Sequence, residues 1–158
     1  MVRGRTAEPD AAAAVMGGDL GGYVLEAQIG HVLRRAHQRA TQIFMAELGD
    51  RFQMTPTQYA ALIKLYELGE QSQNRLGRLT AMDPATIQGV VKRLEERRLV
   101  ERSGDPDDRR RSTLRVTEAG AALAREMLPF GRRVTEVTLE RLGAAERAEF
   151  LVLLQRLA

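Results

Sequence analysis

The side chains best suited to bind a ligand lie on one predicted helix that follows Asp83. Ile87, Val90, Val91 and Leu94 recur at helical spacing and would face a core. The other side of the helix then carries polar residues and one glycine: Thr86, Gln88, Gly89, Lys92 and Arg93. Glutamine can bond adenine through two atoms, lysine and arginine can bond guanine, and glycine lets a backbone approach closely. This pattern is typical of a helix that reads base edges in duplex DNA, although an ordinary solvated helix face would show the same residues.

A second group of basic residues lies in the turn-rich loop Asp105–Arg111. Pro106 and the neighbouring aspartates favour a turn between strand-like runs at 99–102 and 112–116. Arginines that enter a narrow minor groove read its shape, and an aspartate two residues earlier can brace one of them. The alternative is a solvated charge cluster, for which a protein has less need of a hairpin. The candidate DNA-binding residues of this loop are Asp108, Arg109, Arg110 and Arg111.

The elements before this loop form a helix-turn-helix. Ser72 is the expected N-cap of a helix over 73–80, which a short break at Ala81–Met82 separates from the helix after Asp83. A helix, a tight turn, a second helix and a basic hairpin follow the order of a winged helix-turn-helix. Four residues at the start of the first helix are further candidates for DNA contact: Ser72, Gln73, Asn74 and Arg75.

Charge and composition support a DNA partner and exclude several kinds of chemistry. The 158 residues carry a net charge of +3, whereas residues 72–116 alone hold eleven basic and seven acidic side chains. The chain has no cysteine, and its two histidines, His31 and His37, are not spaced as helical metal ligands. The sequence therefore predicts no catalytic residue, no metal and no cofactor. It shows no long apolar run and no secretory signal, so we expect a cytoplasmic protein without a membrane partner.

Apolar helices flank the winged segment and predict a second copy as partner. We expect a flexible tail over 1–19, an amphipathic helix over 20–48 that stops at Gly49, a helix over 56–68, and two more over 118–142 and 145–157. Pro129 should kink the helix over 118–142 or interrupt its hydrogen bonds. The terminal helices expose more apolar surface than one small core covers, which favours an interleaved homodimer.

The expected fold is mainly α with a small β-wing. Residues 20–158 would form a single regulator domain, with a winged helix-turn-helix over 55–117 and a dimerisation lobe from 20–48 and 118–158. The alternative to a DNA-binding regulator is a winged-helix protein-interaction module, because the fold alone does not guarantee DNA binding.

Residues 55–120 resemble the MarR family of bacterial transcription regulators. The family's wing signature Asp-x-Arg matches Asp108 and Arg110, whereas its usual Gly-Leu-Val is Arg98-Leu99-Val100 here. The resemblance implies a homodimer that binds a pseudo-palindromic operator, usually as a repressor, and releases it when a small molecule binds. Oxidation-sensing members depend on cysteine, so the resemblance leaves a ligand-sensing branch.

The effector suggested by the sequence is a small aromatic carboxylate. Family effectors commonly lie between the dimer helices and the DNA-binding lobe, and LRRAHQR at 33–39 resembles members that sense aromatic acids. A cation beside an apolar cleft suits a carboxylate, and tyrosines could stack on the ring. The alternative for each residue is a solvent-facing flank or an intersubunit ion pair. The candidate effector-binding residues are His31, Arg34, Arg35, His37, Tyr59 and Tyr66.

Overall fold

Four polar side chains begin the helices that build the winged segment, each by accepting hydrogen bonds from backbone N–H groups. Thr55 forms a capping box with Gln58 and is followed by a proline. Ser72 accepts from the amide of Arg75, Asp83 from those of Ala85 and Thr86, and Thr117 from that of Gly120. The cap predicted at Ser72 is confirmed. The helices that they open are α3 (Pro56–Leu68), α4 (Gln73–Leu79), α5 (Pro84–Glu96) and α6 (Glu118–Thr138).

The computed structural model describes residues 22–104 and 112–157, in two units, Met1–Ala36 and His37–Ala158. The first unit holds a 3-10 helix, η2 (Leu25–Ala27), and the start of α1 (Ile29–Phe44), so the first long helix begins later than residue 20. The predicted tail over 1–19 lies outside the described residues. The last helix is α7 (Ala144–Gln155). None of the helices within 22–104 and 112–157 is long and apolar enough to cross a membrane.

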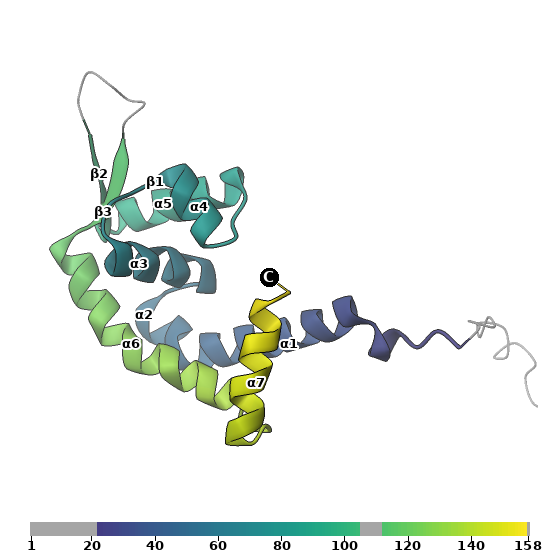
Figure 1. Cartoon of the computed structure of the whole chain (residues 1–158). Coiled ribbons are helices and arrows are strands. Elements are labelled where there is room, and N and C mark those ends of the chain that lie inside the picture. The colour runs from purple at the N-terminus through teal and green to yellow at the C-terminus, as the bar shows by residue number, and fades with distance from the viewer. Residues whose placement is uncertain (1–21, 105–111, 158) are drawn as a thin grey trace, which may run out of the picture. The chain divides into compact units, whose positions relative to one another are not determined.

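A small antiparallel sheet joins the helix-turn-helix to the wing (Figure 1). Its strands are β1 (Gln71–Ser72), β2 (Val100–Ser103) and β3 (Thr113–Val116), in the order β1-β3-β2. The hairpin strands confirm the prediction, whereas β1 was not predicted, because two residues are too few to show alternation. Leu114 of β3 is buried opposite Gln71 and fixes the sheet onto the core.

One hydrophobic core holds these elements together in the second unit. It draws on the end of the first long helix, on α3 to α6 and on the sheet. Phe44 meets Tyr59 edge to face with ring centroids 5.4 Å apart, and Phe52 meets Phe130 in the same way at 5.3 Å. The buried residues are Phe44, Leu48, Phe52, Met54, Ala61, Leu62, Leu65, Leu76, Ile87, Val90, Val91, Leu94, Leu99, Val100, Leu114, Ala124 and Met127.

The first long helix does not stop at Gly49 and Asp50, so that prediction was wrong. The chain continues through a π-helical segment, η3 (Met45–Gly49), into α2 (Asp50–Phe52), and turns only at Gln53. Gln53 has φ of 50°, the left-handed conformation that commonly ends helices. Leu48 and Phe52 lie four residues apart and are both buried, so burial of the apolar stripe outweighs the helix-breaking tendency of glycine.

Pro129 lies inside α6, which continues past it to Thr138. A proline has no N–H to donate to the carbonyl of the residue four positions earlier, so one bond of the helical ladder is missing, as predicted. Met127 is buried and Phe130 packs on Phe52, and these contacts hold the helix on both sides of the interruption.

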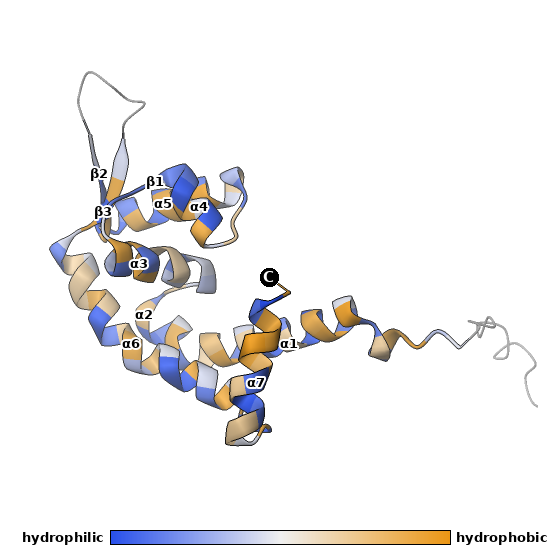
Figure 2. Cartoon of the chain, in the orientation of Figure 1, coloured by the Kyte–Doolittle hydropathy of each residue, from blue (hydrophilic) through white to orange (hydrophobic). Residues whose placement is uncertain are grey.

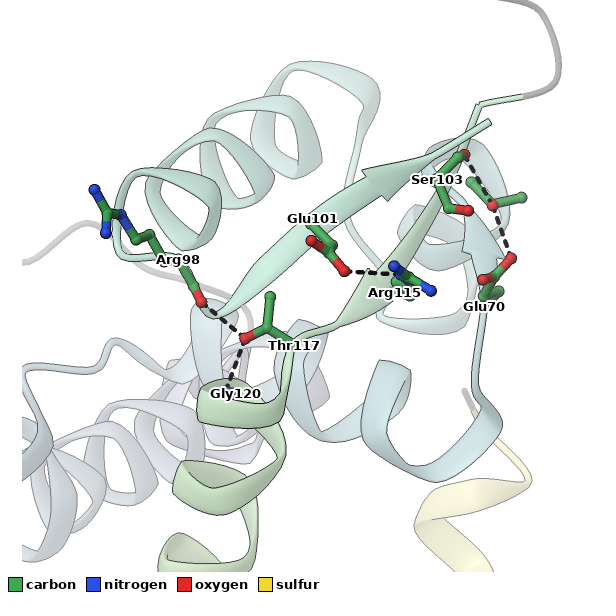
Figure 3. Close-up of polar contacts among 8 residues, drawn as sticks. Glu70, Arg98, Glu101, Ser103, Arg115, Thr117 and Gly120 are labelled. Carbon is green, nitrogen blue, oxygen red and sulfur yellow. Dashed lines mark hydrogen bonds and ion pairs between the residues drawn. The ribbon is translucent and has the colours of Figure 1, made fainter. Parts of the chain in front are cut away.

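Arg98 stands where the family usually has a glycine after α5, and it adopts the left-handed backbone conformation that glycine favours. Its φ is 57°, its N–H donates to the Glu95 carbonyl at 2.8 Å, and the N–H of Leu99 donates to the Leu94 carbonyl at 3.0 Å. These two bonds form a Schellman turn with a non-glycine residue at the left-handed position. The Arg98 carbonyl accepts a hydrogen bond from the Thr117 hydroxyl, which joins this turn to the start of α6 (Figure 3).

We expect Arg98→Gly to stabilise the protein. A side chain in the left-handed region costs roughly 1 kcal/mol, and glycine removes that cost while keeping the turn. Thermal unfolding followed by circular dichroism should show a midpoint about 2–4 °C higher. Arg98→Ala is the control, since it removes the same guanidinium but keeps the Cβ; an equal rise in both variants would attribute the gain to charge instead.

Candidate nucleic-acid interface

Helix α5 has one buried face and one exposed face. Ile87, Val90, Val91 and Leu94 are at most 3% exposed and pack in the core. Packing of this face fixes the rotation of the helix, and the opposite face is left to solvent. The residues predicted to read DNA occupy that opposite face: Thr86, Gln88, Lys92 and Arg93 are exposed, and Gly89 is half-buried.

Asp83 orders the first turn of α5. One carboxylate oxygen accepts from the amides of Ala85 and Thr86, each at 2.9 Å, and the other accepts from the Thr86 hydroxyl at 2.6 Å. The Thr86 side-chain and backbone hydrogen bonds hold the pKa of Asp83 below its ordinary value. The hydroxyl hydrogen of Thr86 is therefore committed to the cap, and only the oxygen lone pairs and the methyl group are left for another partner.

The fold itself does not require Gly89. A Cβ at this position would meet only the Arg93 Nη1 atom within 4 Å, at 3.9 Å. At Gly77 of α4, by contrast, a Cβ would lie 3.1 Å from the Met82 carbonyl oxygen and 3.3 Å from Ile87 Cγ2. Gly77 thus serves the close packing of α4 against α5, whereas Gly89 weakens its helix without relieving any contact in the chain.

The candidate residues at the start of α4 divide into two kinds. Ser72 and Gln73 take part in the fold: the Ser72 hydroxyl accepts from the Arg75 amide, and the Gln73 side-chain oxygen accepts from Arg102 at 3.0 Å. Asn74 and Arg75 are exposed, and their side chains make no hydrogen bond to another described residue. Within the described part of the chain, these two are accordingly the residues of this group whose side-chain donors have no partner.

Arg102 of β2 connects the wing to both helices, which the sequence did not predict. Its Nε atom lies 2.9 Å from a Glu95 carboxylate oxygen, and its Nη2 atom donates to Gln73 at 3.0 Å. The guanidinium therefore links β2 to the last turn of α5 and the first turn of α4. No sequence spacing shows such a link, because it joins side chains from separate elements.

The base of the wing is also tied across its strands. Glu101 and Arg115 are register partners and form an ion pair at 2.8 Å (Figure 3). The Thr113 hydroxyl donates to Glu70 at 3.0 Å and also reaches the Ser103 carbonyl oxygen at 3.1 Å. The predicted wing residues Asp108, Arg109, Arg110 and Arg111 lie outside the described residues.

Several exposed cations surround the face of α5. Lys92 has an i,i+4 partner in Glu96 at 3.9 Å, a separation that adds little in solvent. Arg75, Arg78 and Arg93 form no ion pair with another described residue. Their charge is thus available for phosphates. A metal site has no candidate within the described residues, because no group of three or more His, Cys, Asp or Glu there could hold a metal ion.

The predicted effector residues lie in different surroundings. His31 is half-buried, and Arg34, Arg35 and His37 are exposed along α1. Tyr59 and Tyr66 of α3 are partly buried against the core. Burial raises the pKa of Tyr59, against the opposing effect of the Arg132 charge, so the phenol is neutral and Arg132 is a nearby cation that the sequence did not single out. The Tyr59 hydroxyl occupies the space that a Cβ would take at Gly131.

We expect Arg102→Gln to loosen the wing without unfolding the protein. Loss of the contacts to Glu95 and Gln73 should speed amide hydrogen exchange in β2 and β3 by about fivefold, the equivalent of about 1 kcal/mol in local opening. Arg115→Gln is the matched control, because it breaks a single cross-strand ion pair of the same hairpin and leaves Arg102 with its links to both helices. Equal exchange rates in the two variants would contradict a special role for Arg102.

Comparison with known proteins agrees with this geometry. The model of the MarR family matches residues 54–112. The chain is 43% identical over 135 residues to the HTH-type transcriptional repressor NicR of Pseudomonas putida, covering 85% of each chain. Among solved structures it is similar to BpsR of Bordetella bronchiseptica (TM-score 0.79, 38% identity, 85% of this chain and 96% of that one). It is also similar to PcaV of Streptomyces coelicolor (TM-score 0.77, 32% identity, 85% and 94%). The chain therefore belongs to the MarR family of transcriptional regulators, which are DNA-binding proteins and not enzymes.

Proposed function

We propose that this protein is a homodimeric repressor that binds a pseudo-palindromic operator and releases it when a small aromatic carboxylate binds. The observation that carries the DNA-binding part is the solvent-facing side of α5, which holds an exposed amide, two exposed cations and a half-buried glycine. The name of NicR, a transcriptional repressor, supports repression as the output.

The chemistry of each exposed residue indicates which part of the DNA it would contact. We assign base contact to Gln88, Lys92 and Arg93, and close approach of the DNA to the backbone at Gly89. Ser72, Gln73, Asn74 and Arg75 would approach phosphates at the start of α4, and Thr86 would offer its methyl group and oxygen. The wing residues Asp108, Arg109, Arg110 and Arg111 would serve the minor groove.

The proposed dimer rests on apolar surface that the described chain leaves uncovered. Helix α7 carries hydrophobic residues on its ribbon (Figure 2) and has no buried residue. Val152 and Leu153 on it are 57% and 48% exposed. In the first unit, Tyr23 and Ile29 are 53% and 63% exposed. Such surface favours a second copy. We therefore assign 20–48 and 118–158 to dimerisation and 55–117 to the winged helix-turn-helix, in one regulator domain over 20–158.

The proposed effector rests on the residues and on one relative. BpsR has its DNA binding regulated by 6-hydroxynicotinic acid, an aromatic carboxylate. In this chain Arg34, with His31, Arg35 and His37, would supply cations for the carboxylate. Tyr59 and Tyr66 would contact the ring. Release requires that the ligand prefer a dimer whose recognition helices no longer fit the operator.

We expect Gly89→Ala to raise stability and to lower operator affinity. Alanine removes the glycine penalty in the helix, about 0.5–1 kcal/mol, and the chain has room for the methyl group. The same methyl group would obstruct the close approach of the DNA to the helix backbone at Gly89, so binding to an operator selected from random duplexes should weaken about tenfold. Thermal melts and fluorescence anisotropy measure the two changes on the same sample.

Because the two changes have opposite signs, misfolding cannot produce this result. Unchanged operator affinity would place DNA elsewhere than on this face. Sedimentation of the complex should find two chains per operator, and equal affinity for random and selected duplexes would favour the protein-interaction module instead.

We expect Arg34→Gln to weaken binding of 6-hydroxynicotinic acid, used as a probe, by about tenfold, since a bidentate arginine contact to the carboxylate is lost. Calorimetry with and without operator measures both the affinity and its coupling to DNA, which must be reciprocal. Arg132→Gln is the matched control, because it removes the cation near Tyr59. A loss of affinity in this control alone would move the carboxylate to Arg132, and no heat with wild type would reject this class of effector.

A further inference from the structure

Arg97 ends two helices at once. Its backbone is the C-cap of α5, where its N–H donates to the Arg93 carbonyl at 3.3 Å. Its side chain reaches the end of α2: Nη1 donates to the Gln53 carbonyl at 2.8 Å, and Nη2 to the Phe52 carbonyl at 3.0 Å. One residue therefore joins the end of the recognition helix to the end of the first long helix.

The contact between the Arg97 side chain and the Phe52 and Gln53 carbonyls, called the joint below, suits an arginine. The last carbonyls of a helix have no partner within the helix, and they lie at its negative end. The left-handed turn at Gln53 carries the chain away, so the Phe52 and Gln53 carbonyls are left for a donor from elsewhere. A guanidinium presents two N–H groups in a fixed fork and remains charged, whereas a lysine offers a single point of contact.

The joint acts on the orientation of α5. A helix of 13 residues is about 20 Å long, so a small tilt at its last turn displaces its first turn, where Gln88 and the Asp83 cap lie. Packing of Gly77 against Ile87 holds the first half of α5 against α4. Arg97 holds the opposite end, and it does so through α2, which continues the chain of α1 beyond η3.

We propose that Arg97 is a positioning residue for DNA recognition: its contacts to Phe52 and Gln53 set the angle at which α5 presents its reading face. This inference rests on the proposed function, because it assumes that this face reads the operator. It does not assign Arg97 any contact with DNA. The residue therefore affects the preference for operator over random DNA and not the general attraction to phosphates.

The test compares Arg97→Gln with Arg98→Gln. Both variants lose one exposed guanidinium at adjacent positions, but the Arg98 side chain donates no hydrogen bond to Phe52 or Gln53. Anisotropy titrations with a selected operator and a random duplex give the specificity ratio. We expect the ratio to fall about tenfold in Arg97→Gln and to stay at the wild-type value in Arg98→Gln, with equal affinities of both variants for random DNA.

Further variants keep the result interpretable. Gln53→Gly preserves the accepting carbonyl and relieves the strain of the left-handed backbone at this position. If Arg97→Gln alone is unstable, the double variant with Gln53→Gly and Arg97→Gln can be measured in its place. Arg97→Lys should give an intermediate ratio, because it keeps the charge and loses the fork. Residual dipolar couplings of α5 amides, measured without DNA, should change in Arg97→Gln and not in Arg98→Gln.

Equal ratios and equal couplings in the Arg97→Gln and Arg98→Gln variants would overturn the inference, and so would full recovery in Arg97→Lys, which would reduce the effect to charge. A wild-type protein that does not distinguish operator from random DNA would instead refute the proposed function. The dipolar couplings would then decide the positioning role by themselves.

Discussion

The structure of the DNA-binding lobe depends on the burial of one row of side chains on α5. Ile87, Val90, Val91 and Leu94 enter the core, and burying an aliphatic side chain of this size is worth about 1.5–3 kcal/mol. No rotation of the helix other than the observed one buries all four. Packing on this side thereby exposes the polar face, and the positions of α4 and the sheet follow from packing against the buried side.

Polar side chains then form hydrogen bonds with the backbone groups at the helix ends, which apolar packing leaves without partners. Asp83 supplies acceptors at the start of α5, Arg97 donates to the last carbonyls of α2, and Arg39 binds the Val137 carbonyl near the end of α6. Arg39 also pairs with Glu140 at 2.7 Å. Some arginines of this basic chain are therefore structural, and abundance alone does not identify the ones that contact phosphates. Under the proposed function, exposure distinguishes Arg75 and Arg93, because both are exposed and neither has an ion pair with a described residue.

The sequence predicted what depends on local chemistry. The caps at Thr55, Ser72, Asp83 and Thr117 and the buried row of α5 follow from residue type and spacing within a few positions. The features that the sequence did not reveal are tertiary. The β1 strand exists because Gln71 and Ser72 lie beside β3, and the Arg102 links to Glu95 and Gln73 join three elements. The end of the first helix was misplaced because a local signal, Gly49, was overruled by the burial of Leu48 and Phe52.

The separation of the two faces of α5 has a consequence for which substitutions this protein can tolerate. Residues that hold the fold and residues that face outward occupy different positions of one helix, and the outward positions have few neighbours within the described chain. Gln88 can be exchanged for other polar residues at little cost in stability, since exposed substitutions usually alter it by no more than about 0.5 kcal/mol. Under the proposed function, a population of such variants would stay folded while its preferred operators drift apart. The same scaffold is therefore a suitable starting point for selecting regulators of new promoters.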